Sequence, residues 1–509
     1  MHSYSLRRFC LSALVLLVPG SGAPPELDHL VVIHTNDLHG QVLPRPATWL
    51  EGEGAPPDCG GLERLAACVE SLRSEARQAG LPVLVVDAGD WFQGTPEGRL
   101  DRGRGYLRLL AKLEYDALAV GNHDLDHGPD VLAGHLRAVR LPALLANARL
   151  RDGSRIPGTQ PYRIVRRGNL RIALVGLGSV HTPRMTRAGA QKLVWREPAE
   201  VLSEITAELA GRVDWILPIT HQGVGADREL ARAHPELDLI VGGHSHSLLR
   251  HGVREGKTLV VQAGSGATAV GRVDLWFDPR TKRVVKSKAS LIQLYDLPDP
   301  RFARADLRSA CERLVRRSGK RMDEVVGHLT APLVRGRERT ASSSAGNLVS
   351  DLMRAHAGAQ VALLGRSGLR ADLPAGPVTR RALFSFLPFD DHLLHLSLTG
   401  AELLEVLRAA VEDEGGSGFA LSGLTLELRR GRGKPRLAGA AVGGTALDPE
   451  HTYRVVIDSF SAGGGARKGP LGRARRRGRD SPLLRELVER AFDGGRLTPS
   501  RENRFRRVR

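Results

Sequence analysis

Five short apolar runs in the first half of this chain each end in Asp, Asn or His side chains. They read VVIHTNDLHG, VLVVDAGD, ALAVGNHD, WILPITHQG and LDLIVGGHSH. Each run is rich in β-branched and aliphatic residues, which favours a buried strand that then breaks into polar residues. Several such strand endings in one chain are typical of a metal site. The seven candidate ligands are Asp37, His39, Asp90, Asn122, His221, His244 and His246.

The spacing of these residues suits shared ions. Asp37 and His39 are two residues apart, and so are His244 and His246. Residues two apart in an extended segment face the same side, so each pair can reach one ion. Carboxylates and imidazoles suit divalent metals such as zinc, manganese or iron. Seven ligands exceed one tetrahedral site, so the sequence predicts two divalent ions sharing a carboxylate, an arrangement suited to attack on phosphorus.

The alternation of apolar strands and amphipathic helices predicts a layered α/β domain over residues 28–294. Residues 295–323 form a candidate linker, in which residues 298–317 read as a helix after a proline-rich break. A second domain, also mixed α/β, is expected over residues 324–509. Its predicted helices are residues 345–358 and 399–413, and its predicted strands are residues 360–365, 424–444 (a strand pair) and 452–460.

The N-terminus reads as a secretory signal peptide over residues 1–23, with a basic start, a short apolar core and a small-residue cleavage pattern. No later segment is long and apolar enough to cross a membrane. The sequence therefore predicts an exported protein, periplasmic or extracellular. Export permits disulfides, but Cys59, Cys68 and Cys311 are an odd number, and inert thiols are an equal alternative to a Cys59–Cys68 bridge.

The net charge of +18 comes mostly from arginines that are scattered along the chain, apart from a cluster at residues 467–479. We interpret this excess as solvated surface and favour it over a nucleic-acid partner. His34 and His127 are interpreted as ordinary hydrogen-bonded histidines rather than ligands.

The motifs NDLHG, GDWFQGT, GNHDLDHG, THQG and GGHSH resemble the successive motifs of the calcineurin-like metallophosphoesterases. More closely, they resemble the secreted branch that contains 5'-nucleotidases, UDP-sugar hydrolases and cyclic-nucleotide phosphodiesterases. The resemblance covers nearly the whole mature chain. It implies a four-layer α/β/β/α catalytic domain, a linker helix and a mixed α/β C-terminal substrate-binding domain, with the active site between the two domains.

The resemblance also implies roles for individual residues. Asp37, His39, Asp90 and His246 would hold one ion, and Asp90, Asn122, His221 and His244 the other. His123 would contact the phosphate, and Asp126 would orient it. In this family, metal-bound water or hydroxide attacks the terminal phosphate in line, without a covalent enzyme intermediate.

The substrate side follows from the same resemblance. Phe389 and Phe460 would sandwich a base, while Arg335, Arg339 and Arg370 would contact substrate oxygens. Two loops depart from the family pattern. GRSGLR has Gly365 where the family usually has Asn, and SAGGGARKG has Ala466 where the family has an Asp that binds the ribose hydroxyls. These changes, with Arg366 and Arg467 nearby, favour a more anionic leaving group or a looser site.

The sequence therefore predicts an exported dinuclear metallophosphoesterase that hydrolyses phosphate esters of nucleotide-like substrates. Three alternatives stay open. The first is a phosphodiesterase, nuclease or cyclic-nucleotide phosphodiesterase, and the second is a relative of the sulfur-oxidation hydrolases. The third is a basic anion- or nucleic-acid-binding protein with structural metals, although such a protein would not need both His123 and Asp126.

Overall fold

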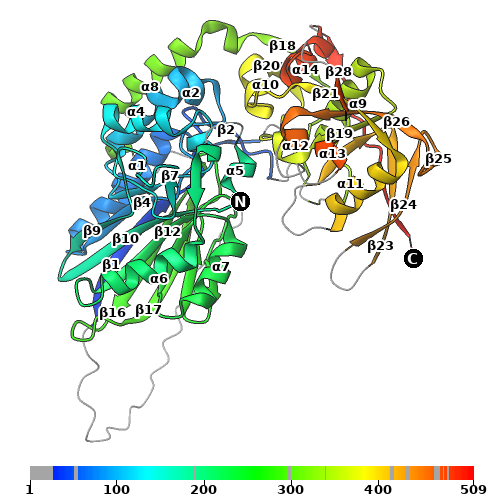
Figure 1. The fold of residues 1–509 in the computed structure, drawn as a ribbon. Helices are drawn as coiled ribbons and strands as arrows, with labels where there is room; N and C mark the ends of the chain where they lie inside the picture. Colours follow the sequence, from blue (N-terminus) through cyan, green and yellow to red (C-terminus); the bar gives the residue numbers. More distant parts are fainter. Residues whose placement is uncertain are drawn as a thin grey trace, which may run out of the picture.

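The computed structural model of the chain describes residues 27–50, 56–186, 190–295, 300–336, 338, 340–412, 418–430, 435–463, 470–473, 475–477, 481–493 and 495–508. The predicted signal peptide lies outside these ranges. Two domains are arranged side by side and joined by a helix across their top (Figure 1).

Two sheets form the centre of the first domain. One has the order β17-β16-β1-β4-β5-β6-β8 and the other β14-β15-β13-β12-β10-β9. The strands of the first sheet are β1 (Asp28–Thr35), β4 (Val83–Asp87), β5 (Ala117–Ala119), β6 (Ala143–Leu144), β8 (Thr159–Gln160), β16 (Ala269–Phe277) and β17 (Val284–Gln293). Those of the second are β9 (Tyr162–Arg167), β10 (Leu170–Gly178), β12 (Trp215–His221), β13 (Leu239–Gly242), β14 (Val253–Glu255) and β15 (Thr258–Val261).

Helices cover the outer face of each sheet. On the first sheet these are α1 (Leu62–Gln78), α3 (Arg104–Leu110) and α4 (Pro129–Val139), and on the second α6 (Pro198–Glu208) and α7 (Val224–Ala233). A third apolar core lies between the sheets and contains side chains from both, such as Val32 and Leu174. The predicted four-layer α/β/β/α arrangement is therefore confirmed.

The parallel strands β1, β4 and β5 of the first sheet and β10, β12 and β13 of the second run in register with their neighbours. Because parallel strands end at the same edge of a sheet, the loops after β1, β4, β5, β12 and β13 open at one edge of the sandwich. These are the loops that carry the candidate ligands.

The linker helix is α8 (Ala305–Ser318), which begins seven residues later than the helix expected from residue 298. A short 3-10 turn at Pro300–Phe302 precedes it. Leu307, Cys311 and Leu314 of α8 are buried in the core of the first domain. The helix therefore packs as part of that domain while leading to the second.

The C-terminal domain is built on a five-stranded sheet with the order β22-β19-β26-β21-β27. A three-stranded sheet, β20-β18-β28, and a four-stranded sheet, β25-β24-β23-β29, flank it. Its strands are β18 (Val325–Leu329), β19 (Val361–Gly365), β20 (Gly376–Thr379), β21 (Leu393–Thr399), β22 (Phe419–Ser422), β23 (Leu424–Arg430), β24 (Pro435–Val442), β25 (Thr445–Ala446), β26 (Thr452–Asp458), β27 (Arg475–Arg477), β28 (Arg496–Leu497) and β29 (Phe505–Val508). Its main helices are α9 (Ser344–Ala357), α10 (Arg380–Phe386), α11 (Gly400–Glu412) and α14 (Leu484–Phe492).

One predicted element ends differently. The strand expected over residues 452–460 stops at Asp458, and Phe460 lies in the short helix α12 (Ser459–Gly463). The Asp458 side chain accepts from the backbone amide of Ser461, which satisfies one of the first amides of that helix and starts it early.

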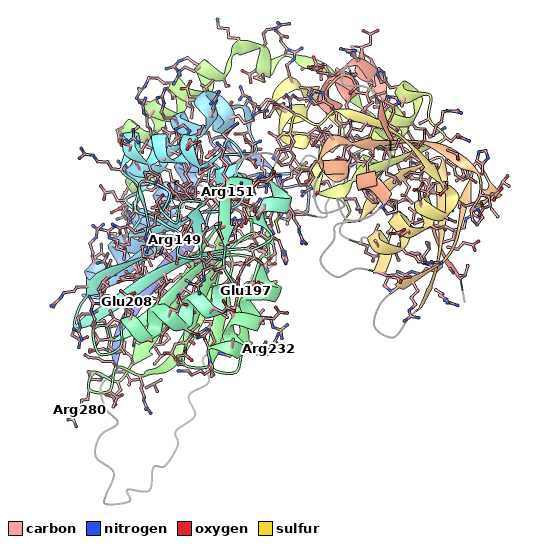
Figure 2. All side chains as sticks on the ribbon, viewed as in Figure 1. Arg149, Arg151, Glu197, Glu208, Arg232 and Arg280 are labelled. Atoms are coloured by element: carbon pink, nitrogen blue, oxygen red, sulfur yellow. The ribbon has the colours of Figure 1, made fainter. Side chains whose placement is uncertain are left out.

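The three cysteines of the described chain, Cys59, Cys68 and Cys311, are free and buried, so no bridge forms between the first two. Among the described residues, no helix combines the length and apolar character that a membrane crossing needs. The side chains labelled in Figure 2 are arginines and glutamates of the first domain. The labelled residues are Arg149, Arg151, Glu197, Glu208, Arg232 and Arg280.

Candidate metal centre and active site

The candidate ligands leave their strands through unusual backbone conformations. Positive φ angles occur at Asp37 (50°), His39 (50°), Asp90 (60°), His244 (79°) and His246 (54°). Such angles cost about 1–3 kcal/mol for a residue with a Cβ and persist only where the surroundings impose them. Five of the twelve non-glycine residues with positive φ among the described residues are candidate ligands, so the fold holds these side chains in strained turns at the site.

The glycines of the motifs allow the loops to approach one another. A Cβ at Gly121 would lie 2.2 Å from Oδ1 of Asp90, and one at Gly243 would lie 2.7 Å from the Ala88 carbonyl oxygen. Any side chain at either position would displace a neighbouring ligand loop. The GN and GG dipeptides are therefore explained by packing at the site.

Six of the seven candidate side chains fall into two groups, and within each the ligand atoms lie within 4.8 Å of one another. The groups are Asp37, His39 and His246, and Asp90, His221 and His244. The seventh, Asn122, joins the second group, because its Oδ1 lies 2.9 Å from Nδ1 of His244 and 3.2 Å from Nε2 of His221.

Asp90 lies between the two groups. Its Oδ2 is 3.2 Å from Nε2 of His221 and 3.9 Å from Nε2 of His39. One carboxylate thus reaches both sets of ligands, which is the geometry that a bridging ligand requires.

The residues present fit divalent cations. In the part of the chain that the structure describes, Oδ1 of Asp37 is buried without a hydrogen-bond partner and lies 3.2 Å from Nε2 of His246, a position that is costly for a carboxylate unless a cation neutralises it. Nε2 of His39 lies 2.9 Å from Nε2 of His246, so two nitrogens of neighbouring rings face the same point. Burial lowers the pKa of His39, and lowers that of His244 to about 4, which keeps both rings in the neutral form that binds metals.

Backbone carbonyls orient two of the rings. Nδ1 of His39 donates to the Gln93 carbonyl at 2.7 Å, and Nδ1 of His221 donates to the Ala88 carbonyl at 2.6 Å. Each bond turns Nε2 toward the centre. The sequence could not reveal these contacts, because every residue type carries the same carbonyl.

A carboxylate missed by the sequence reasoning supports the centre. Asp124 is buried and accepts hydrogen bonds from the backbone amides of Asp90, Trp91 and Gly121, at 2.8 to 3.0 Å. It ties the loop after β4 to the loop after β5. Its place directly after Asn122 and His123 in GNHD was the signal that could have drawn attention to it.

His123 and Asp126 lie together beside the two groups. Nδ1 of His123 donates to Oδ2 of Asp126 at 2.9 Å, and the His123 amide donates to Oδ1 of Asp90 at 2.8 Å. Burial disfavours charge on the imidazole, but the carboxylates of Asp126 and Asp90 outweigh it and raise the pKa of His123. The pair can therefore hold and donate a proton.

A cavity of about 430 Å³, called here the Phe389 chamber, opens beside this pair between the two domains. Its walls include His123, Asp126, Arg370, Phe389 and Phe460. The Phe389 ring stacks on the His123 ring, with centroids 5.3 Å apart and planes 23° apart. The structure thus brings both predicted aromatic residues to one cavity next to the candidate ligands.

Arg370 reaches from the C-terminal domain to the candidate ligands. Its Nη2 lies 3.0 Å from Nε2 of His39 and 3.4 Å from Nε2 of His246. The guanidinium thus places a positive charge next to the two ligand nitrogens that would bind a cation. The same charge lies beside the point where phosphoryl oxygens would lie.

The other predicted arginines lie elsewhere. Nε of Arg335 donates to Asp372 at 3.1 Å, and Arg335 borders a second cavity rather than the Phe389 chamber. Arg339 lies outside the described residues, as do Ala466 and Arg467.

The side chain of Arg366 gives no support to a more anionic leaving group, and Arg467, the other arginine behind that expectation, lies outside the described residues. The Arg366 guanidinium donates to the backbone carbonyls of Ala341 at 2.6 Å and Arg335 at 3.0 Å. The side chain therefore fixes the neighbouring loop and does not line the Phe389 chamber.

Ion pairs hold the two domains against each other at the Phe389 chamber. Arg99 of the first domain donates from both terminal nitrogens to Asp390, at 3.0 and 2.7 Å, and Arg485 donates to the same carboxylate at 2.5 Å. Burial opposes ionisation of Asp390, but the two arginines outweigh it and lower the pKa of that carboxyl. A second ion pair between the domains joins Arg381 of the C-terminal domain to the buried Glu97 of the first domain.

Comparison with known proteins identifies both domains. The family described as calcineurin-like phosphoesterase matches residues 30–248, and the family described as 5'-nucleotidase, C-terminal domain, matches residues 325–468. The chain is 26% identical over 477 residues to endonuclease YhcR of Bacillus subtilis (strain 168). That alignment covers 88% of this chain, but the chain spans only 38% of that relative.

Two solved structures from Thermus thermophilus share the architecture. A 5'-nucleotidase precursor is 28% identical with a TM-score of 0.81, and the match covers 94% of this chain and 99% of that one. Sulfate thiohydrolase SoxB is 20% identical with a TM-score of 0.81, covering 96% and 98%, which shows a shared fold only. With both domains matched in order, this chain belongs to the calcineurin-like metallophosphoesterases that carry a 5'-nucleotidase C-terminal domain.

Proposed function

We propose that this protein is an exported dinuclear-metal phosphoesterase that hydrolyses phosphate esters of nucleotide-like substrates. The observation that carries the proposal is the meeting of two ligand groups beside the His123–Asp126 pair, which lines the Phe389 chamber together with Asn122 and His244 of the second group. A site that only bound metal for stability would have no use for a buried, carboxylate-paired histidine facing the cavity.

In the proposed centre, Asp37, His39 and His246 would hold one divalent ion, and Asn122, His221 and His244 would hold the other. Asp90 lies within reach of both groups and would contribute to holding both ions. Zinc and manganese both suit this mixed set of carboxylate, amide and imidazole ligands. Two bound ions would acidify a water and neutralise phosphoryl oxygens.

The chain's own residues supply the remaining steps. Asp126 engages Nδ1 of His123, so Nε2 is the ring nitrogen left to contact a phosphoryl oxygen or to protonate the departing ester oxygen. Arg370 contributes fixed positive charge at the same point. Phe389 and Phe460 offer aromatic walls for a leaving group with a flat ring, such as a nucleobase.

Relatives with this architecture carry the names 5'-nucleotidase, endonuclease and sulfate thiohydrolase. A nucleotide monoester fits the Phe389 chamber, and this is the substrate we favour. A phosphodiester is the second candidate, because another arginine-lined cavity borders His39 and His246 of the first ligand group. The signal peptide proposed at residues 1–23 would deliver the protein to the periplasm or the extracellular space.

The test is a substrate panel with manganese-loaded protein: p-nitrophenyl phosphate, its bis ester, adenosine 5'-monophosphate, a nucleotide sugar and a cyclic nucleotide. We expect hydrolysis that is lost on dialysis against EDTA and restored by manganese. His123→Ala should lower kcat by about 100-fold or more, as expected for an acid–base residue. His251→Ala, which changes an exposed histidine away from the site, is the control. Activity that survives His123→Ala or metal removal would contradict the proposal.

A further inference from the structure

A second cavity, of about 330 Å³, also has Arg370 in its wall. We call it the Arg45 chamber. Most of its walls come from residues between 39 and 49 of the first domain and between 370 and 385 of the second, and Glu97, His246, Gly266 and Arg335 also line it. Arg370 lines both chambers, so the two cavities meet at this guanidinium.

The candidate ligands face different chambers. His39 and His246, from the first ligand group, border the Arg45 chamber. Asn122 and His244, from the second group, border the Phe389 chamber. A phosphorus atom held between the groups would therefore have room for one ester substituent on each side.

Arginines dominate the charge of the Arg45 chamber. The charged residues along its walls are Arg45, Arg335, Arg370, Arg381, Glu97 and Asp372. Two of the four arginines are neutralised, because Arg335 pairs with Asp372 and Arg381 pairs with Glu97. Within the described ranges, no carboxylate lies within ion-pair distance of the other two arginines.

Among the described residues, the guanidinium of Arg45 has an incomplete set of hydrogen-bond partners. Its Nε is sealed from solvent and has no hydrogen-bond partner, and its Nη2 reaches the Ser265 carbonyl at only 3.3 Å. The guanidinium lies 5.6 Å from the centroid of the Trp49 ring. Burial lowers the pKa of Arg45 to about 10, so the group still carries its charge at neutral pH.

The backbone at Gly266 leaves room for the Arg45 guanidinium. A Cβ at Gly266 would lie 2.8 Å from the Arg45 Cζ atom, so a side chain there would push the guanidinium out of place. Arg45 is partly buried and has no carboxylate partner among the described residues, and such a cation costs stability unless an anion compensates it. An anionic group of a ligand in this chamber would supply that compensation.

We propose that the Arg45 chamber binds a second anionic group of a phosphodiester substrate, carried on the ester substituent that is not cleaved. This inference rests on the proposed function and concerns its second candidate substrate class, the phosphodiesters. Water attacks the diester phosphorus, the bond to the leaving oxygen in the Phe389 chamber breaks, and that oxygen takes a proton. The retained substituent stays in the Arg45 chamber as a phosphomonoester. A simple monoester would leave this chamber unused.

The experiment compares two chromogenic diesters that differ by one phosphate. They are thymidine 5'-(p-nitrophenyl phosphate) and the same compound with a 3'-phosphate. In both, p-nitrophenol leaves and thymidine is retained, so the 3'-phosphate is the second anion. The wild-type, manganese-loaded protein should show a KM about tenfold lower for the 3'-phosphorylated diester, the size expected for one charge-assisted contact.

Substitutions at Arg45 test whether the lower KM for the 3'-phosphorylated diester comes from the Arg45 chamber. Arg45→Gln should abolish the KM ratio between the two diesters, and Arg45→Lys should retain part of it. Arg108→Gln removes the same charge from the exposed face of α3 and should keep the full ratio. The comparison in the wild-type protein stands even if a variant at Arg45 fails to fold.

The outcomes separate the two proposals. Equal KM values for the two diesters, with p-nitrophenyl phosphate still hydrolysed, would overturn this inference and leave the proposed function standing. A preference that survives Arg45→Gln would also overturn it. If neither diester nor p-nitrophenyl phosphate is hydrolysed, both this inference and the proposed function are overturned.

Discussion

Replacing Asp126 with Asn tests how the chain uses His123. The Asp126 carboxylate accepts from Nδ1 of His123 at 2.9 Å, and the two side chains are only 15% and 11% exposed. A hydrogen bond to a charged group in such a setting is worth about 1.5–3 kcal/mol, or about 10–100-fold in rate if it acts in the transition state. Asn keeps the shape but removes the charge that favours a protonated ring.

The assay compares kcat for two monoesters. Adenosine 5'-monophosphate releases a strongly basic alkoxide that needs a proton, whereas p-nitrophenyl phosphate releases a stable anion. If His123 protonates the leaving oxygen, Asp126→Asn should lower kcat by about 10–100-fold for the nucleotide and by less than about fivefold for the nitrophenyl ester. Equal losses would show that His123 acts on the phosphoryl oxygens instead. Unchanged kcat for the nucleotide would refute the reasoning. Asp130→Asn, at an exposed carboxylate of α4, is the control.

Three further predictions concern the framework of the site. Gly121→Ala places a methyl group 2.2 Å from Oδ1 of Asp90. This variant should bind one metal ion per chain or fewer, while its circular dichroism spectrum stays unchanged. Full metal content would contradict this prediction. Arg99→Ala removes a half-exposed ion pair between the domains. We therefore expect KM for nucleotides to rise about fivefold, and the radius of gyration measured by X-ray scattering to increase. No change in either quantity would show that the Arg99–Asp390 pair does not hold the two domains together. Burial raises the pKa of Asp227 to about 7, so the folded chain keeps this carboxyl neutral while the unfolded chain ionises it above about pH 4. The contribution of the neutral Asp227 carboxyl to stability is complete below about pH 4 and is lost as the pH rises to about 7. In EDTA, Tm of the wild-type protein should therefore fall between pH 5 and 7, and Asp227→Asn should reduce this fall. Parallel curves of Tm against pH for the two proteins would argue against the prediction.

The ligand set could be predicted from the sequence because strand ends, residue types and spacing are all local properties. Asp37 and His39 were expected to share an ion from their separation alone, and the structure places both in one group. The backbone that achieves this is not extended, however, since both residues have positive φ angles. The pairing expected from the spacing arises through strained turns rather than through a regular strand.

The substrate side was harder to predict because it depends on contacts between distant segments. Arg366 looked like a cation for the substrate, but its partners are carbonyls of another loop, about thirty residues away in sequence. Arg45 lies in a short segment with no periodicity, and only the approach of residues 370–385 makes it part of a cavity. Neither contact leaves a pattern in the residues that flank it.

The central claim is that the two ligand groups hold two ions in one centre. Its most direct test is the metal content of the full-length protein, measured by inductively coupled plasma mass spectrometry after loading with manganese and gel filtration. We predict two ions per chain in the wild-type protein and at most one after Asp90→Ala, because Asp90 contacts both groups. A single ion in the wild-type protein, or two ions retained by the Asp90 variant, would contradict the account.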